Sequence, residues 1–182
     1  MSKSKLSTYI LLDRSGSMQG SKWENAIGSI NAYVEELQKD EEIEGTVTVA
    51  AFDGNQSYGY NNQVNWTNAT VRAIPTVEKN VVDFTVLRKN QNLNKFKKLK
   101  TDELSPRGGT PLYDATAQLL NMAELKPAEK TIIIIMTDGE ENQSQIYNLK
   151  SIKDRLATCT NRGWEVVFLG DKELKELRLY LS

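Results

Sequence analysis

The amino-acid sequence predicts an α/β fold, in which a central, mostly parallel sheet of about five strands has helices on both faces. Strand-like apolar runs alternate with segments of helical periodicity along most of the chain, which is typical of parallel strands joined by helices. The run 131–137 reads Thr-Ile-Ile-Ile-Ile-Met-Thr without polar alternation, as expected for a parallel strand covered on both faces. A hairpin signal after residue 52 predicts one antiparallel strand at the sheet edge. We therefore expect a three-layer architecture.

The composition is that of a globular chain of ordinary polarity. The 182 residues are 39% hydrophobic and 26% charged, and they suffice for one domain spanning 1–182 with its own core. The formal net charge of −1 predicts neither a nucleic-acid nor a membrane partner. No apolar stretch approaches the roughly 20 residues that cross a bilayer, and the N-terminal apolar run is too brief for a signal peptide.

Two absences exclude whole classes of site. The chain has no histidine, and Cys159 is its single cysteine. A Ser-His-Asp triad, a Cys-His pair, a zinc site of Cys and His ligands and an intrachain disulfide are therefore impossible within this chain. Cys159 shares one helical face with Leu149, Ile152 and Leu156, which predicts a buried, inert thiol. These features fit a protein of a reducing, cytoplasmic compartment.

The N-terminal part predicts a strand, a helix and a second strand in that order. Residues 6–12 form an apolar, buried strand, and Ser21 with Glu24 forms a capping box that begins the helix. The second strand spans 46–52, and its hairpin partner is expected at about 57–66. The apolar face of the helix consists of Ala26, Ile27, Ile30, Tyr33, Val34 and Leu37.

The segment 67–105 is the least regular part of the chain and resembles an insertion. Its pattern predicts short strands near 71–74 and 82–87, followed by a short helix near 93–99. The stretch from 88 to 100 is basic and contains no acid. Its cations are Arg88, Lys89, Lys95, Lys97, Lys98 and Lys100. They are interpreted as a solvated helix face or, alternatively, as a docking patch for an acidic protein surface or nucleic acid.

The C-terminal part continues the alternation of helices and strands. Pro111 suits the first position of a helix whose inward residues are spaced by three and four. After the apolar strand, a helix is expected at about 145–160, stopped by Gly163, and then a strand at 166–169. A short final helix is expected in 171–182, with Leu174, Leu177 and Leu181 on one face.

Three strand or loop ends carry side-chain oxygen atoms. Asp13, Ser15 and Ser17 follow the first strand, Thr110 follows a double glycine, and Asp138 follows the strand 131–137. Alternate residues of an extended segment point the same way, so the first three can converge. Ligand crevices of open α/β sheets form at the carboxyl ends of strands. Hard oxygen donors suit Mg²⁺, Mn²⁺ or Ca²⁺, although each residue alone is also a common turn or helix-cap residue.

These five residues resemble the metal-ion-dependent adhesion site of von Willebrand factor A domains, which have a Rossmann-like fold. That family carries Asp-x-Ser-x-Ser, then a distant Thr, then a distant Asp, and this sequence fills all five positions. The flanking segments are similar to short, stand-alone bacterial and bacteriophage members, over about residues 5–170. The resemblance implies that Ser15 and Ser17 bind a divalent cation directly, with Mg²⁺ the first expectation. Thr110 would bind directly or through water, while Asp13 and Asp138 hold bound waters.

The resemblance implies a protein-binding module whose cation coordinates an Asp or Glu carboxylate of a partner protein. We expect a monomer or weak oligomer; Tyr58, Tyr60 and Trp66 fit either an interface or hairpin packing. A structural component of a phage particle or an ATPase complex, with a structural metal, is the alternative. A metal-dependent phosphohydrolase is less favoured, because Ser15 replaces the second Asp of haloacid-dehalogenase-type phosphatases and no histidine is present. We therefore expect no enzyme activity.

Overall fold

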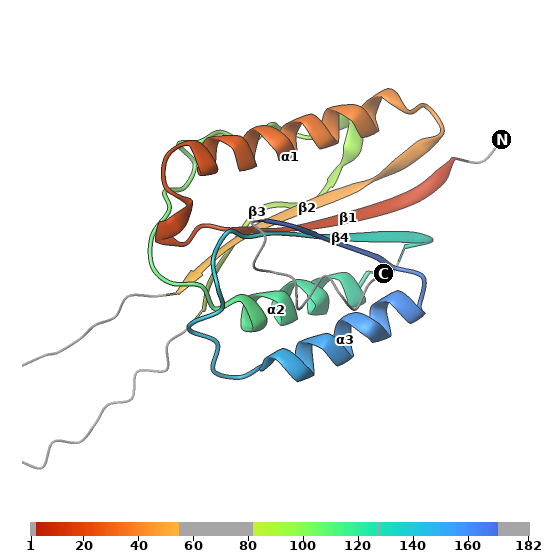
Figure 1. Ribbon diagram of the computed structural model, residues 1–182. Helices are drawn as coiled ribbons and strands as arrows, with labels where there is room; N and C mark the ends of the chain where they lie inside the picture. The colour runs from red at the N-terminus through yellow and green to blue at the C-terminus, as the bar shows by residue number, and fades with distance from the viewer. Residues whose placement is uncertain (1–2, 55–81, 127, 171–182) are drawn as a thin grey trace, which may run out of the picture.

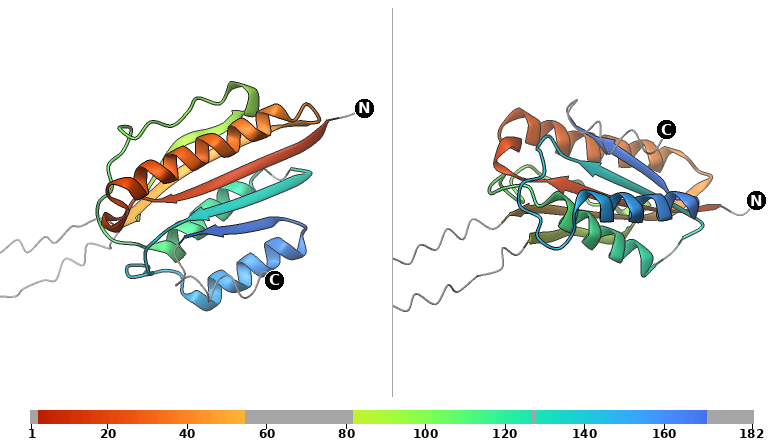
Figure 2. Two further views of the ribbon diagram at one scale, coloured as in Figure 1. Left: turned by 45° about the horizontal axis from the view of Figure 1, so that its top comes forward. Right: turned by 60° about the horizontal axis from the view of Figure 1, so that its bottom comes forward.

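The computed structural model describes residues 3–54, 82–126 and 128–170 and has three layers. Five strands form one sheet in the order β3-β2-β1-β4-β5. Helix α1 covers one face of this sheet, and α2 and α3 cover the other (Figures 1 and 2). The strands are β1 Ser4–Asp13, β2 Ile43–Gly54, β3 Val82–Asn92, β4 Lys130–Met136 and β5 Glu165–Leu169. The α-helices are α1 Ser21–Lys39, α2 Leu112–Glu124 and α3 Leu149–Asn161, and two short 3₁₀ helices are η1 Gly16–Met18 and η2 Leu93–Lys95.

The sheet confirms the predicted α/β class. Strand β1 lies at its centre and pairs in parallel with β2 and β4, while β5 pairs in parallel with β4. Strand β3 is antiparallel to β2 at one edge. The predicted partner of β2, 57–66, lies outside the described residues, and β3 occupies that antiparallel place instead. The predicted strand 71–74, the helix in 171–182, and Tyr58, Tyr60 and Trp66 also lie outside the described residues.

The central strands are apolar on both sides because both faces of the sheet are covered. In β1, Tyr9 and Leu11 pack on the α2 and α3 side, while Ile10 and Leu12 pack on the α1 side. Consecutive strand residues point to opposite faces, so each face receives alternate side chains. The Ile run of β4 divides in the same way, with Ile133 in one cluster and Ile134 in the other. This burial explains the apolar runs in the sequence.

Three predicted helix starts are wrong. Helix α1 begins at Ser21 after Gly20, whose φ of 73° suits glycine, so Ser21 is helical and caps nothing. Pro111 lies before the first residue of α2 instead of within it. Helix α3 begins at Leu149 instead of 145, because the buried Asp114 carboxylate accepts the backbone N–H groups of residues 145–147. Asn148 then caps α3 together with Ser151.

The predicted helix at 93–99 is also wrong, since only Leu93–Lys95 is helical and the chain then runs extended. The physical reason is Asn31 of α1, whose side-chain amide bonds both the N–H (2.8 Å) and the C=O (2.9 Å) of Leu99. Leu99 is buried, and its packing against the α1 layer holds the segment in this shape. The basic stretch therefore lies on a strand, a 3₁₀ turn and an extended segment.

Parallel pairing brings the carboxyl ends of β1 and β4 to one edge of the sheet. Leu12 pairs with Met136, so Asp13 and Asp138 follow directly at neighbouring strand ends. The loop before α2 reaches the same edge, where Gly109 forms an isolated bridge with Gly54 at the end of β2. Within 3–54, 82–126 and 128–170, no helix is both long and apolar enough to traverse a bilayer.

Cys159 of α3 is buried, as predicted, and burial raises the pKa of its thiol. We expect it to react with a disulfide reagent at pH 8 far more slowly than a free cysteine, because the reactive thiolate is disfavoured and shielded. Absorbance assays in buffer and in guanidinium would check this, with full reaction expected only after unfolding. Reaction of the native protein at the rate of a free cysteine would contradict it.

Candidate metal centre

The predicted site residues meet at the edge where β1 and β4 end. Asp13 is the last residue of β1, and Ser15 and Ser17 lie in the turn that leads through η1 to α1. Thr110 lies two residues before α2, and Asp138 lies two residues after β4. Parallel pairing of β1 with β4 therefore juxtaposes residues that are more than a hundred positions apart in sequence.

Asp13 is the buried end of this cluster. Its side chain is inaccessible, with Oδ1 accepting the Ser15 N–H (2.6 Å) and Oδ2 accepting the Thr137 hydroxyl (2.6 Å). Burial raises the pKa of the Asp13 carboxyl, the hydrogen bonds from Thr137 and Ser15 offset part of this effect, and the nearby Asp138 charge adds to it. A buried carboxylate with a raised pKa is stabilised by a cation placed beside it.

The two serine hydroxyls connect Asp13's turn to Asp138. The Oγ atoms of Ser15 and Ser17 are 3.0 Å apart, and Ser17 donates to Asp138 Oδ1 at 2.8 Å. Ser15 is buried, whereas Ser17 is exposed. The cluster therefore runs from the interior at Asp13 to the surface at Ser17, and its outer side is accessible to another molecule.

Thr110 contributes to the cluster from the loop before α2, and its hydroxyl lies close to Gly139. A Cβ atom on Gly139 would be 2.9 Å from Thr110 Oγ1, 3.5 Å from Asp13 Oδ2 and 3.5 Å from Ser17 Oγ. Three oxygen atoms from two separate segments thus lie around one point that a side chain on Gly139 would fill. The oxygen-only donor set suits Mg²⁺ or another hard cation. In the ranges described, His, Cys, Asp and Glu form no metal-binding group of three, so any cation site here depends on the hydroxyls.

The sequence analysis missed Lys22, which lies in the first turn of α1. Its Nζ forms an ion pair with Asp138 Oδ2, and its side chain is half exposed. The turn after Ser17 folds back to start α1, which places Lys22 beside the end of β4. No spacing rule links Lys22 to Asp138, so only the tertiary structure identifies this contact.

Asn142, which the sequence did not identify as a site residue, fixes the backbone of Thr110. Asn142 Oδ1 accepts the Thr110 N–H (2.8 Å), and the Asn142 N–H donates to the Thr110 carbonyl (3.1 Å). The adjacent Glu141 and Ser144 accept the N–H of Tyr113 at the start of α2 (2.9 and 3.0 Å). The polar run after Asp138 was the available signal, since such a run following a buried strand often positions a neighbouring loop.

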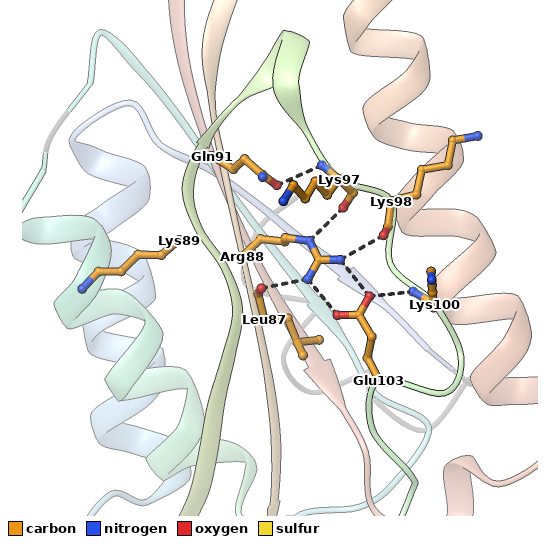
Figure 3. Close-up of a pocket in the computed structure, with 8 residues that line it drawn as sticks. All are labelled: Leu87, Arg88, Lys89, Gln91, Lys97, Lys98, Lys100 and Glu103. Carbon is orange, nitrogen blue, oxygen red and sulfur yellow. Dashed lines mark hydrogen bonds and ion pairs between the residues drawn. The ribbon is translucent and has the colours of Figure 1, made fainter.

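The predicted basic residues do not join the metal cluster. Arg88 lies near the middle of the edge strand, opposite Val49. Its guanidinium donates to the carbonyls of Leu87, Lys97 and Lys98 and to both oxygens of Glu103, so it joins β3 to the following segment (Figure 3).

Around Arg88 lies an open hollow of about 520 Å³. Lys89 points away from Arg88 (Figure 3). Lys98 pairs with Glu35 of α1. Lys95 and Lys97 are exposed, and the partner-binding role of these four lysines stays a prediction.

Comparison with solved structures shows the fold. A von Willebrand factor type A protein from Catenulispora acidiphila matches with a TM-score of 0.55 at 20% identity, over 98% of this chain and 36% of that one. A variant of the PilB minor pilin from Streptococcus sanguinis matches with a TM-score of 0.51 at 10% identity, over 99% and 60%. Proximal thread matrix protein 1 from the mussel byssus matches with a TM-score of 0.50 at 13% identity, over 92% and 35%.

The chain thus spans less than two thirds of the length of each of these structures. No curated protein sequence matches it. The family model of the von Willebrand factor type A domain matches residues 8–179, which include all five clustered residues. The chain therefore belongs to the von Willebrand factor type A domain family.

Proposed function

We propose that the protein binds a divalent cation, with Mg²⁺ preferred, and through it an acidic side chain of a partner protein. The observation that carries this proposal is the convergence of Thr110, Asp13 and Ser17 oxygens on the point left open by Gly139. Ser15, Ser17 and Thr110 would hold the cation, and Asp13 and Asp138 would orient its waters and balance its charge. The cation, when bound, supplies Lewis-acid attraction for a carboxylate.

The arrangement favours binding over catalysis. An aspartate that accepts a phosphoryl group needs a free, accessible oxygen, but Asp13 is fully buried and both its oxygens already accept hydrogen bonds. The neutral hydroxyls donate little charge to a cation, which leaves it strongly attractive to an incoming carboxylate. The exposed position of Ser17 gives that carboxylate a route to the site. We therefore propose a binding module without enzyme activity.

The first test measures the cation directly. We expect the EDTA-treated protein to bind Mn²⁺ in calorimetry and Ser17→Ala to weaken binding about tenfold or more, because a proposed ligand is lost. Ser29→Ala is the matched control, since this exposed α1 serine lies away from the cluster. Equal affinities of Ser17→Ala and the unchanged protein would contradict the proposal.

The second arm of this test measures the partner. The immobilised protein should retain a partner from an extract of its source cells in Mg²⁺ and release it in EDTA, and Ser17→Ala should retain none. If the cation binds and stabilises the fold, but the protein retains its partner equally well in EDTA, the result would favour the alternative, in which the metal is structural.

Asp13→Asn tests the cost of the buried carboxylate. Because burial raises the pKa of Asp13 above its ordinary value of 3.8, its ionised form destabilises the fold near pH 7. In EDTA we expect Asp13→Asn to be at least as stable as the unchanged protein at pH 7. This advantage should shrink as the pH falls through the raised pKa towards 3.8. Mg²⁺ should raise the Tm of the unchanged protein but not that of Asp13→Asn. Thermal melts at several pH values, with EDTA and with Mg²⁺, would measure both effects. An equal rise in the Tm of Asp13→Asn with Mg²⁺ would contradict the proposed role of Asp13.

Lys22→Met tests the ion pair with Asp138. The Lys22 ammonium repels a divalent cation and occupies one Asp138 oxygen, so its removal should strengthen Mn²⁺ binding several-fold. The gain should fall with added salt, because the Lys22 side chain is half exposed and its charge is screened. Calorimetry at two salt concentrations would measure the change, with Lys39→Met at the far end of α1 as control. Weaker binding in Lys22→Met would show that Lys22 instead holds Asp138 in place.

A further inference from the structure

Arg14 lies at a variable position of the Asp-x-Ser-x-Ser pattern, yet its side chain is buried. Only 5% of that side chain is exposed, and its Nη2 bonds Asp53 Oδ1 at 3.1 Å and Asp83 Oδ2 at 3.0 Å. Asp53 and Asp83 are opposite residues at the paired ends of β2 and β3. A buried guanidinium needs such anionic partners, because an unpaired buried charge is strongly destabilising. The turn that carries Ser15 and Ser17 is thereby tied to the end of β2.

Asp53 joins a second arginine from another loop. Its side chain is 1% exposed, and its other oxygen, Oδ2, accepts Arg107 Nε at 2.8 Å. Arg107 also pairs with Asp83 through Nη2. Arg107 precedes Gly108, Gly109 and Thr110, so one carboxylate links both loops that carry hydroxyl ligands. We name Arg14, Asp53 and Arg107 the arginine clamp.

The backbones of these loops are in direct contact where the arginine clamp holds them. The hydrogen bonds run from Arg107 N to Arg14 O (2.7 Å), from Gly16 N to Gly108 O (3.1 Å) and from Gly54 N to Gly109 O (2.9 Å). Gly108 has a φ of +70°, and a Cβ atom there would be 2.1 Å from Gly54 O. This close approach requires glycine, and it makes the separation of the loops sensitive to small shifts.

We propose that Asp53 is a positioning residue of the metal site, which sets the separation of Thr110 from Ser15 and Ser17 by holding Arg14 and Arg107 together. This inference rests on the proposed function. Asn142 also fixes the backbone of Thr110, through hydrogen bonds to its N–H and its carbonyl. Residues that orient metal ligands from behind change metal affinity by about 10- to 100-fold when they are substituted.

Two variants test the arginine clamp. Asp53→Asn removes one of the two carboxylates that Arg14 and Arg107 share, since Asp83 also pairs with both arginines. The buried Arg14 loses one of its anionic partners in this variant, which therefore risks unfolding. Arg107→Gln is the safer variant, because the Arg107 side chain is 61% exposed and its backbone bond to Arg14 remains. Glu103→Gln is the matched control, since Glu103 also forms a two-bond pair with an arginine, Arg88, outside the metal cluster.

The first measurement is amide hydrogen exchange in EDTA, which needs no bound metal. Arg107→Gln should accelerate exchange at the Gly16 and Gly54 N–H groups, and Glu103→Gln should not. Unchanged exchange at both amides in Arg107→Gln would overturn the proposal.

The second measurement is Mn²⁺ affinity by calorimetry, where Arg107→Gln should weaken binding about 10-fold and Glu103→Gln should leave it unchanged. Accelerated exchange with unchanged Mn²⁺ affinity would also overturn the positioning role. If the unchanged protein bound no Mn²⁺, the proposed function would fail, and with it the metal-positioning role. The exchange data would still decide whether the Arg107 side chain, through its carboxylate partners, holds the two loops together.

Discussion

The buried carboxylate of Asp13 is the constraint around which this end of the molecule is built. It lies at the end of the central strand, where burial raises its pKa and disfavours its charge. The Ser15 N–H and the Thr137 hydroxyl stabilise that charge; Ser15 lies in the turn after β1 itself, and Thr137 directly follows the neighbouring strand β4. The parallel pairing of β1 with β4 makes this possible, because it brings both strand ends to one edge.

Ion pairs hold the loops at this edge in position, and glycines let these loops pack closely. Asp53 attracts two arginines, while Gly108 allows its backbone to approach that of Gly54 more closely than a side chain would permit. Gly139 has the corresponding role on the third loop, where it leaves space beside Thr110. Charged side chains hold the loops together, and the glycines at 108 and 139 leave room where a Cβ atom would lie too close to a neighbouring oxygen atom.

Much of the fold was predictable from periodicity, and two of the errors share one cause. The apolar runs of β1 and β4 indicated strands because both faces of the sheet bury their side chains. The predicted start of α3 and the predicted helix at 93–99 were wrong because polar groups from distant parts of the sequence bind these backbones. Asp114 takes the N–H groups before α3, and Asn31 takes both backbone groups of Leu99. Such contacts connect segments of unrelated spacing, so no local pattern contains them.

The sequence by itself determined the α/β class and the residue types of the candidate site, because hydrophobic periodicity and short motifs are local properties. It also excluded histidine chemistry, a Cys-His pair and an intrachain disulfide, because the chain has no histidine and one cysteine. Only the tertiary structure decided that β3 is the antiparallel edge strand, that Lys22 pairs with Asp138, and that Asp53 joins two loops. These features depend on which segments become neighbours. The order of strands in the sheet sets those neighbours, and long-range packing decides that order.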